Sequence, residues 1–265
     1  MGNGECRQSS EGNWRLLYLP SLWSQELWRE ISSHLQSIRE GFRRHPETRK
    51  IGYRSGETRL ELYLKIYYPS TPLEGLKDLF RHSRAFRAFR ACRVLSLHGF
   101  HVPIGVAAGE IRTLRWVRLA FLLTLSVPAL PLPQYVKAQY PSDGEGPAVR
   151  RKREFLRQLA LEVRRMHRLG FIHGDLLASN IMVQANEDQL NFYTLDHDRT
   201  RRYPAWLPNG LWRRNLVQLN RVELPGISVR DRIRFLKFYL GCRGLCVTQR
   251  LSPARFSPFF SVSHC

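Results

Sequence analysis

Apolar and polar residues alternate along residues 51–68, where two predicted strands flank a turn at Ser55-Gly56. The second of these strands, residues 60–68, is rich in aromatic and branched apolar side chains. One or two further strands are predicted over residues 111–127. The first half of the chain is therefore expected to be rich in β-structure.

Apolar residues recur at helical spacing in five other segments. Glycine residues that favour a helix end follow two of them, at Gly99 and Gly170. The clearest helix leads through Gly170 directly into a polar loop. The predicted helices are residues 24–38, 76–98, 153–169, 211–222 and 229–240.

The order of these elements predicts an α+β protein with two lobes, a β-rich first lobe and a helical second lobe. The Pro-rich stretch at residues 128–133 is a candidate hinge between them. The expected units are an N-terminal extension of unclear role, the first lobe, the second lobe and a divergent tail. Their predicted bounds are 1–50, 51–127, 128–240 and 241–265.

The loop after residue 170 carries the residues with the clearest chemistry. It holds His173, Asp175 and Asn180, and a second carboxylate, Asp196, follows an apolar stretch further on. A carboxylate can accept or orient a hydroxyl proton, and carboxylate and amide oxygens are ligands that Mg²⁺ prefers. The pattern predicts metal-dependent phosphoryl transfer, with Asp175 as the base and Asn180 and Asp196 as ligands of Mg²⁺ bound to ATP.

A plain β-hairpin with polar turns is the competing interpretation, because Asp and Asn are common turn residues. The spacing from Asp175 to Asn180 is nevertheless that of a kinase catalytic loop. Gly174 stands where ordinary protein kinases have Arg. This difference favours kinase-like enzymes that act on small molecules or sugars.

Lys65 lies inside the aromatic-rich predicted strand, between bulky apolar residues. A lysine in such a place needs an anionic partner, and the phosphates of ATP would be that partner. A lysine that faces solvent from an edge strand is the alternative. In a kinase cleft, backbone groups near Leu125 to Val127 would hydrogen-bond the adenine.

The net charge of +20 attracts polyanions, such as nucleic acid, an anionic membrane or a phosphorylated glycolipid. Only six of the 42 basic residues are Lys, and Arg is the residue suited to bidentate phosphate contacts. Codon bias in a GC-rich genome is the competing explanation. No nucleic-acid-binding motif accompanies the charge, so we expect no nucleic-acid partner.

The five cysteines are scattered and odd in number, which predicts a reducing compartment rather than a disulfide framework. No signal peptide is expected. The longest apolar run, near residues 119–127, is too short to cross a bilayer. It is expected to be a buried strand.

The chain resembles the bacterial lipopolysaccharide core kinases, the family of Kdo kinases and heptose kinases. The resemblance covers roughly residues 50–240. The Asp-x-Asp-Arg run and the later patches distinguish it from aminoglycoside and choline phosphotransferases. The matching motifs are Tyr63 to Lys65, Ser83 to Ala85 with Gly99, Val102-Pro103, His173 to Asp175 with Asn180, Leu195 to Arg199, Arg214 to Leu216, and Asp231-Arg232 with Arg234 to Leu236.

This resemblance implies a protein-kinase-like fold and ATP-dependent phosphorylation of a Kdo or heptose sugar of the inner core on lipid A. It implies that Lys65 holds the α- and β-phosphates, that Asp175 is the catalytic base, and that Asn180 and Asp196 bind Mg²⁺. Arg199 would contact phosphate or brace the loop. The expected partners are the core glycolipid and an anionic membrane surface, at the cytoplasmic face of the bacterial inner membrane. The oligomeric state stays open.

The chain departs from the family pattern in its first lobe. Alignment on Gly99 puts Ala88 where the family has a Glu that pairs with the strand lysine. Lys65 would then lack its carboxylate, unless Glu110 or another acid replaces it. Two alternatives stay open: a small-molecule phosphotransferase of aminoglycoside-kinase type, and a kinase-like module that binds without catalysis.

Overall fold

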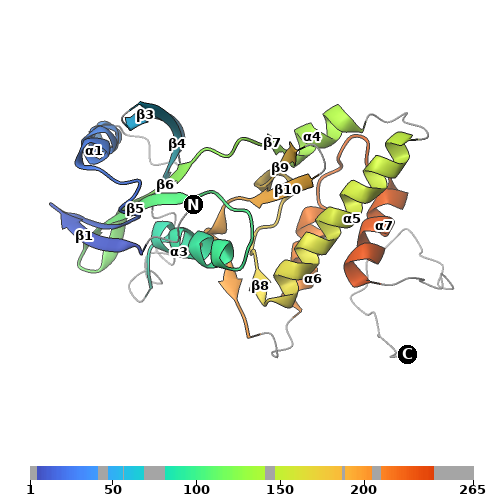
Figure 1. The fold of residues 1–265 in the computed structure, drawn as a ribbon. Coiled ribbons are helices and arrows are strands. Elements are labelled where there is room, and N and C mark those ends of the chain that lie inside the picture. The colour runs from blue at the N-terminus through green and yellow to red at the C-terminus, as the bar shows by residue number, and fades with distance from the viewer. Residues whose placement is uncertain are drawn as a thin grey trace.

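The computed structural model describes most of the chain, including both expected lobes (Figure 1). The described residues are 5–40, 47–55, 57–68, 81–140, 147–186, 189–204 and 210–241. Gly56, the start of the predicted helix at 76–98, and the tail from residue 242 lie outside them.

The first lobe is built on a six-stranded antiparallel sheet in the order β1-β2-β5-β6-β4-β3. Its strands are β1 (Arg7–Glu11), β2 (Trp14–Tyr18), β3 (Glu47–Ser55), β4 (Thr58–Tyr67), β5 (Gly105–Thr113) and β6 (Trp116–Leu125). The strands predicted around Ser55 and over residues 111–127 are thus confirmed.

Two helices cover the two faces of this sheet, α1 (Gln25–Glu40) on one and α3 (Arg84–Leu97) on the other (Figure 1). Successive strand side chains point to opposite faces, so Leu16 packs in the cluster of α1 and Leu17 in the cluster of α3. The burial of Phe86 and Phe89 confirms the apolar stripe expected for the α3 helix.

The segment expected to be an N-terminal extension contributes β1, β2 and α1 to the first lobe. The two strands are only five residues long and carry many polar side chains, so their alternation did not stand out. Trp14 packs edge-on against Phe121, with ring centroids 5.3 Å apart. Trp14 also packs edge-on against Trp28 of α1. The aromatic residues of this segment therefore belong to the core of the lobe.

The second lobe is mainly helical, with two small sheets, β10-β9-β7 and β11-β8. The predicted helices at 153–169, 211–222 and 229–240 are confirmed, the first with an earlier start. A helix at residues 132–139 was not predicted, because it begins within the Pro-rich stretch. The elements are α4 (Leu132–Gln139), α5 (Pro147–Arg168), α6 (Leu211–Leu219), α7 (Val229–Leu240), β7 (Leu130–Pro131), β8 (Phe171–Ile172), β9 (Ile181–Asn186), β10 (Gln189–Thr194) and β11 (Arg201–Arg202).

Helix α3 takes part in the cores of both lobes. Phe86 and Phe89 pack against the sheet, whereas Cys92 and Leu95 lie in the core of the second lobe. Arg165 of α5 donates hydrogen bonds to the carbonyls of His98 and Gly99, just after α3 ends. The lobes are therefore joined by packing as well as by the chain.

No helix in the described part of the chain is long and apolar enough to cross a membrane.

Candidate active site

The polar loop between β8 and β9 is anchored by a buried histidine. The His173 ring is fully buried and its Nε2 lies 2.8 Å from the Leu195 carbonyl, one residue before Asp196. A second buried ring, His197, lies with its centroid 4.8 Å from that of His173. This contact ties the loop of Asp175 to the segment of Asp196.

Gly174 is required at its position by both its backbone and its neighbours. Its φ of +79° lies in the left-handed region, and a Cβ there would come within 2.7 Å of the Arg199 carbonyl. An arginine would meet the same obstruction. The glycine that distinguishes this loop from a protein-kinase loop thus allows the segment after Asp196 to pack directly on it.

Helix α6 supports the same loop through two amide side chains, Asn215 and Gln218. The buried Asn215 Oδ1 accepts from the backbone N–H of His173, at 3.0 Å. Gln218 Nε2 donates to the Gly174 carbonyl, at 3.1 Å, and to Asp175 Oδ1, at 3.4 Å. The Arg214 to Leu216 motif drew attention to this helix only as a family feature, and nothing in the spacing pointed to Gln218.

Asp175 and Asn180 are held in one loop by a hydrogen bond. Asn180 Nδ2 donates to the Asp175 carbonyl, at 3.0 Å, and the backbone N–H of Leu195 donates to the Asn180 carbonyl, at 2.8 Å. The amide nitrogen is thereby engaged, which leaves Oδ1 as the side-chain atom of Asn180 suited to a cation. Both side chains are partly exposed.

Lys65 and Asp196 form an ion pair that joins the two lobes. Lys65 Nζ lies 2.7 Å from Asp196 Oδ1, and the two side chains are 28% and 30% exposed. The family's helix glutamate is absent at Ala88, and the sequence left open whether another acid replaces it; Asp196, from the second lobe, is the acid that pairs with Lys65. Asp196 has a φ of +62°, a left-handed conformation that Asp tolerates better than most residues.

Glu110 does not replace the missing acid. Its fully buried carboxylate accepts from Arg112, from Arg15 and from the backbone N–H of Ser83, just before α3. Burial raises the pKa of Glu110, but the Arg112 and Ser83 hydrogen bonds outweigh it and hold the pKa below its usual value. Ala88 is fully buried among apolar side chains of the same lobe. Glu110 therefore holds the start of α3 by hydrogen bonds, whereas Ala88 contributes to the apolar packing of the helix.

Asp198 forms a second bridge between the lobes. Its buried carboxylate accepts a 2.6 Å hydrogen bond from Nε of Arg84, at the start of α3. The guanidinium of Arg84 and the ammonium of Lys65 both lie over the Tyr67 ring, within 5.5 and 5.2 Å of its centroid. Arg199 is exposed, and its backbone packs against Gly174.

The segment from Leu125 to Val127 leaves the first lobe at the end of β6. The backbone N–H of Leu125 donates to Ile104, and that of Ser126 donates to Glu61. The Val127 carbonyl accepts from Ala129. These bonds occupy three of the backbone groups that were candidates for binding adenine. Within the described residues, no backbone hydrogen bond uses the N–H of Val127.

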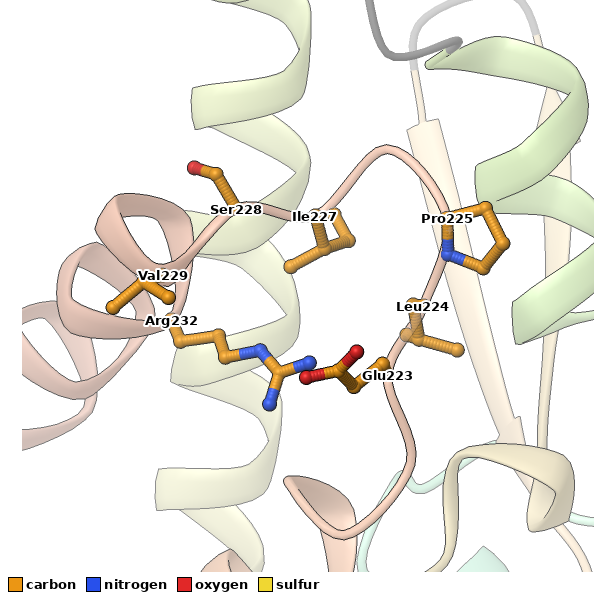
Figure 2. A pocket seen from close by; sticks show the side chains of 7 residues that line it. All are labelled: Glu223, Leu224, Pro225, Ile227, Ser228, Val229 and Arg232. Atoms are coloured by element: carbon orange, nitrogen blue, oxygen red, sulfur yellow. The ribbon is translucent and has the colours of Figure 1, made fainter. Parts of the chain in front are cut away.

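A hollow of about 370 Å³ lies elsewhere, between α6 and the start of α7. Figure 2 shows Glu223 and Arg232 pointing toward each other across it. None of the sequence-predicted site residues lines it.

Three histidines that support the site make stability sensitive to acid: His173, His197, and His167, whose Nε2 lies 3.1 Å from Asn215 Oδ1. Burial, the largest cause, lowers the pKa of His167 to about 4, and it also lowers the pKa of His173 and of His197. Between pH 6.5 and about 4 the unfolded chain therefore binds protons at His167 that the folded protein excludes. The contribution of His167 to stability is therefore present above pH 6.5 and is lost as the pH falls toward about 4.

We expect the free energy of unfolding to fall by about 2 kcal/mol between pH 6.5 and pH 5 from His167 alone. Denaturant titrations at both pH values measure it. His167→Gln should reduce the pH slope, since it removes one titrating ring. Equal unfolding free energies at pH 6.5 and pH 5 would contradict the prediction.

Comparison with known proteins agrees with the resemblance seen in the sequence. The family described as "Lipopolysaccharide kinase (Kdo/WaaP) family" matches residues 33–239. The lipopolysaccharide core heptose(I) kinase WaaP of Escherichia coli (strain K12) is 26% identical over 236 residues, covering 80% of this chain and 87% of that protein. A solved structure of WaaP in complex with acyl carrier protein aligns with a TM-score of 0.58 and 21% identity, over 86% of this chain and 89% of the other.

The structural likeness confirms the bilobal kinase-like fold. The family match covers the six-stranded sheet from β3 onward, the loop of Asp175 and most of the helical lobe. The chain therefore belongs to the lipopolysaccharide kinase (Kdo/WaaP) family, and it is a phosphotransferase with a hydroxyl group as acceptor.

Proposed function

We propose that the protein is an ATP-dependent kinase of the lipopolysaccharide inner core and that its acceptor is a heptose on the lipid A-anchored core. The observation that carries the proposal is the Lys65–Asp196 pair, which brings the strand lysine to the segment beside the Asp175 loop. The name of the 26% identical relative favours heptose over Kdo.

In this proposal the Asp175 carboxylate accepts the proton of the acceptor hydroxyl as that oxygen attacks the γ-phosphate. Gln218 supports the choice of Asp175, because its amide orients the carboxylate without adding a charge. Asn215 also holds the loop, by accepting from the backbone N–H of His173, so the Asp175 carboxylate needs little rearrangement to meet the hydroxyl.

The residues present fit a magnesium ion by the chemistry of their donors. Asn180 donates to the Asp175 carbonyl through Nδ2, which leaves its amide oxygen Oδ1 for a cation. Asp196 has a second carboxylate oxygen besides Oδ1, which pairs with Lys65. The described residues contain no group of three or more His, Cys, Asp or Glu that could hold a metal alone, so phosphate and water oxygens would complete the shell. When bound, Mg²⁺ neutralises charge on the transferred phosphate.

Lys65 is proposed to hold the α- and β-phosphates, and the backbone near Leu125 to Val127 to hold the adenine. The N–H of Val127 is the donor we assign, since the N–H groups of Leu125 and Ser126 are used within the sheet. Asp198 is proposed to be structural, because its carboxylate is buried on Arg84.

The alternative of a non-catalytic module rested on Ala88, and the Asp196 carboxylate beside Lys65 supports a catalytic role instead. The family match supports a core sugar rather than an aminoglycoside as acceptor.

We also propose that the protein works as a peripheral enzyme at the cytoplasmic face of the inner membrane, where its net charge of +20 would meet anionic lipid. The WaaP structure contains an acyl carrier protein, a partner that this sequence did not suggest, and co-purification would test it here.

The test is a transfer assay with Mg²⁺-ATP and three acceptors: a heptose-bearing core glycolipid, a Kdo–lipid A lacking heptose, and an aminoglycoside. Mass spectrometry should find phosphate on the heptose of the first acceptor only. Transfer to Kdo alone would overturn the choice of sugar. Transfer to none of the three, with folded enzyme, would overturn the function.

A further inference from the structure

Helix α7 presents an apolar stripe on the surface of the second lobe. Its exposed residues are Val229, Ile233, Leu236 and Leu240, which are 73%, 41%, 40% and 41% exposed. Spacings of three and four residues put all four on one face of a helix. The opposite face holds Asp231, Phe235 and Tyr239 against α5 and the core.

The stripe has cationic borders. Arg230 and Lys237 lie along one side of it by helical spacing, and Arg232 lies along the other. Arg230 and Lys237 form no ion pair with another residue in the described part of the chain. Helix α7 runs beside α5 at the end of the molecule away from the first lobe (Figure 1).

The positive charge beside the α7 stripe indicates which kind of partner can bind it. In a twofold contact between two copies, the cationic borders of one stripe would face those of the other. The chain that follows α7, residues 242–265, has three Arg and no Asp or Glu, so it offers no acidic complement either. An apolar stripe with basic borders matches a lipid surface with anionic headgroups, where the stripe enters the acyl boundary and the cations meet phosphate.

We infer that the outer face of α7 is the membrane-docking surface of this protein, seated on anionic lipid. The hollow adjoins this surface at the start of the helix, where Val229 and Arg232 line both and where Glu223 faces Arg232 (Figure 2). The inference rests on the proposed function, which requires the enzyme to reach a lipid-anchored acceptor. It adds the surface that makes the contact.

The test compares co-sedimentation of the full chain with two kinds of vesicle, phosphatidylglycerol with phosphatidylethanolamine and pure phosphatidylcholine. The double variant Ile233→Asn, Leu236→Asn should bind the anionic vesicles at least about tenfold more weakly than the wild type. Arg230→Glu with Lys237→Glu should lose binding at low salt while it keeps the apolar stripe. Leu114→Asn is the matched control, because Leu114 is 89% exposed at a hairpin of the first lobe.

Turnover with a short soluble core fragment separates this inference from the proposed function. Both α7 variants should keep wild-type turnover on the fragment, which also shows that they fold, and lose transfer to acceptor embedded in vesicles. Failure of wild-type turnover on every acceptor would overturn the function and leave the binding comparison valid. Three results would overturn the docking surface: equal vesicle binding by wild type and α7 variants, an equal loss of binding in Leu114→Asn, or a soluble dimer that the double variant Ile233→Asn, Leu236→Asn dissociates.

Discussion

Asp175→Asn is expected to reduce phosphate transfer by about 10²- to 10⁴-fold while the protein folds and binds nucleotide as before. The amide keeps the shape of the carboxylate and can still accept the hydrogen bond from Gln218, but it cannot take the hydroxyl proton. Steady-state turnover with the core acceptor measures the loss, and the thermal midpoint reports the fold.

Glu154→Gln provides the control for removing a carboxylate, because Glu154 is half-exposed and its partners among the described residues are neighbours on its own helix. Its turnover should be unchanged. A turnover of Asp175→Asn within about threefold of wild type, less than roughly 1 kcal/mol in activation free energy, would reject Asp175 as the base.

Asp196→Asn is expected to abolish magnesium-dependent turnover, because it removes the anionic ligand that we propose for Mg²⁺ and also the partner of Lys65. Asn is the better replacement here than Ala, since Asp196 has a φ of +62° and Asn tolerates that conformation. The change therefore tests charge with little backbone strain. Activity as a function of Mg²⁺ concentration is the measurement.

Asp198→Asn is the companion variant, two residues along the same segment. Its carboxylate is buried and pairs with Arg84, so the change should lower the thermal midpoint while the folded protein keeps most of its turnover. An inactive Asp198→Asn beside an active Asp196→Asn would show that the roles of the two carboxylates are reversed.

Periodicity predicted the helices and most strands because their apolar residues repeat over long segments. Helix α7 was located to the residue, and β3 and β4 were placed on either side of the expected turn. The five-residue strands β1 and β2 were missed, since β2 joins the sheet by pairing with β5, whose sequence position is remote, and β1 joins it by pairing with β2. Helix α4 was missed because its start lies among prolines, which sit well in a first helical turn.

The sequence revealed the residues of the loop because they are neighbours in the chain, and it revealed Lys65 because a lysine is unusual inside an apolar strand. Asp175, Asn180 and Asp196 follow one another within one loop and hairpin. The pairing of Lys65 with Asp196 spans 131 residues, and a family alignment pointed instead to a helix glutamate. Gln218 lies 43 residues from Asp175, and a glutamine on an amphipathic helix has no sequence signal that distinguishes it from a solvated side chain.

The position of α3 bears on how the protein can come apart. A helix with Phe89 in one core and Leu95 in the other cannot keep its packing when either core melts. The two lobes thus behave as a single cooperative unit, with one heat-absorption peak rather than two in calorimetry. Expressed alone, the first lobe would carry a helix whose last turns are stripped of their apolar neighbours.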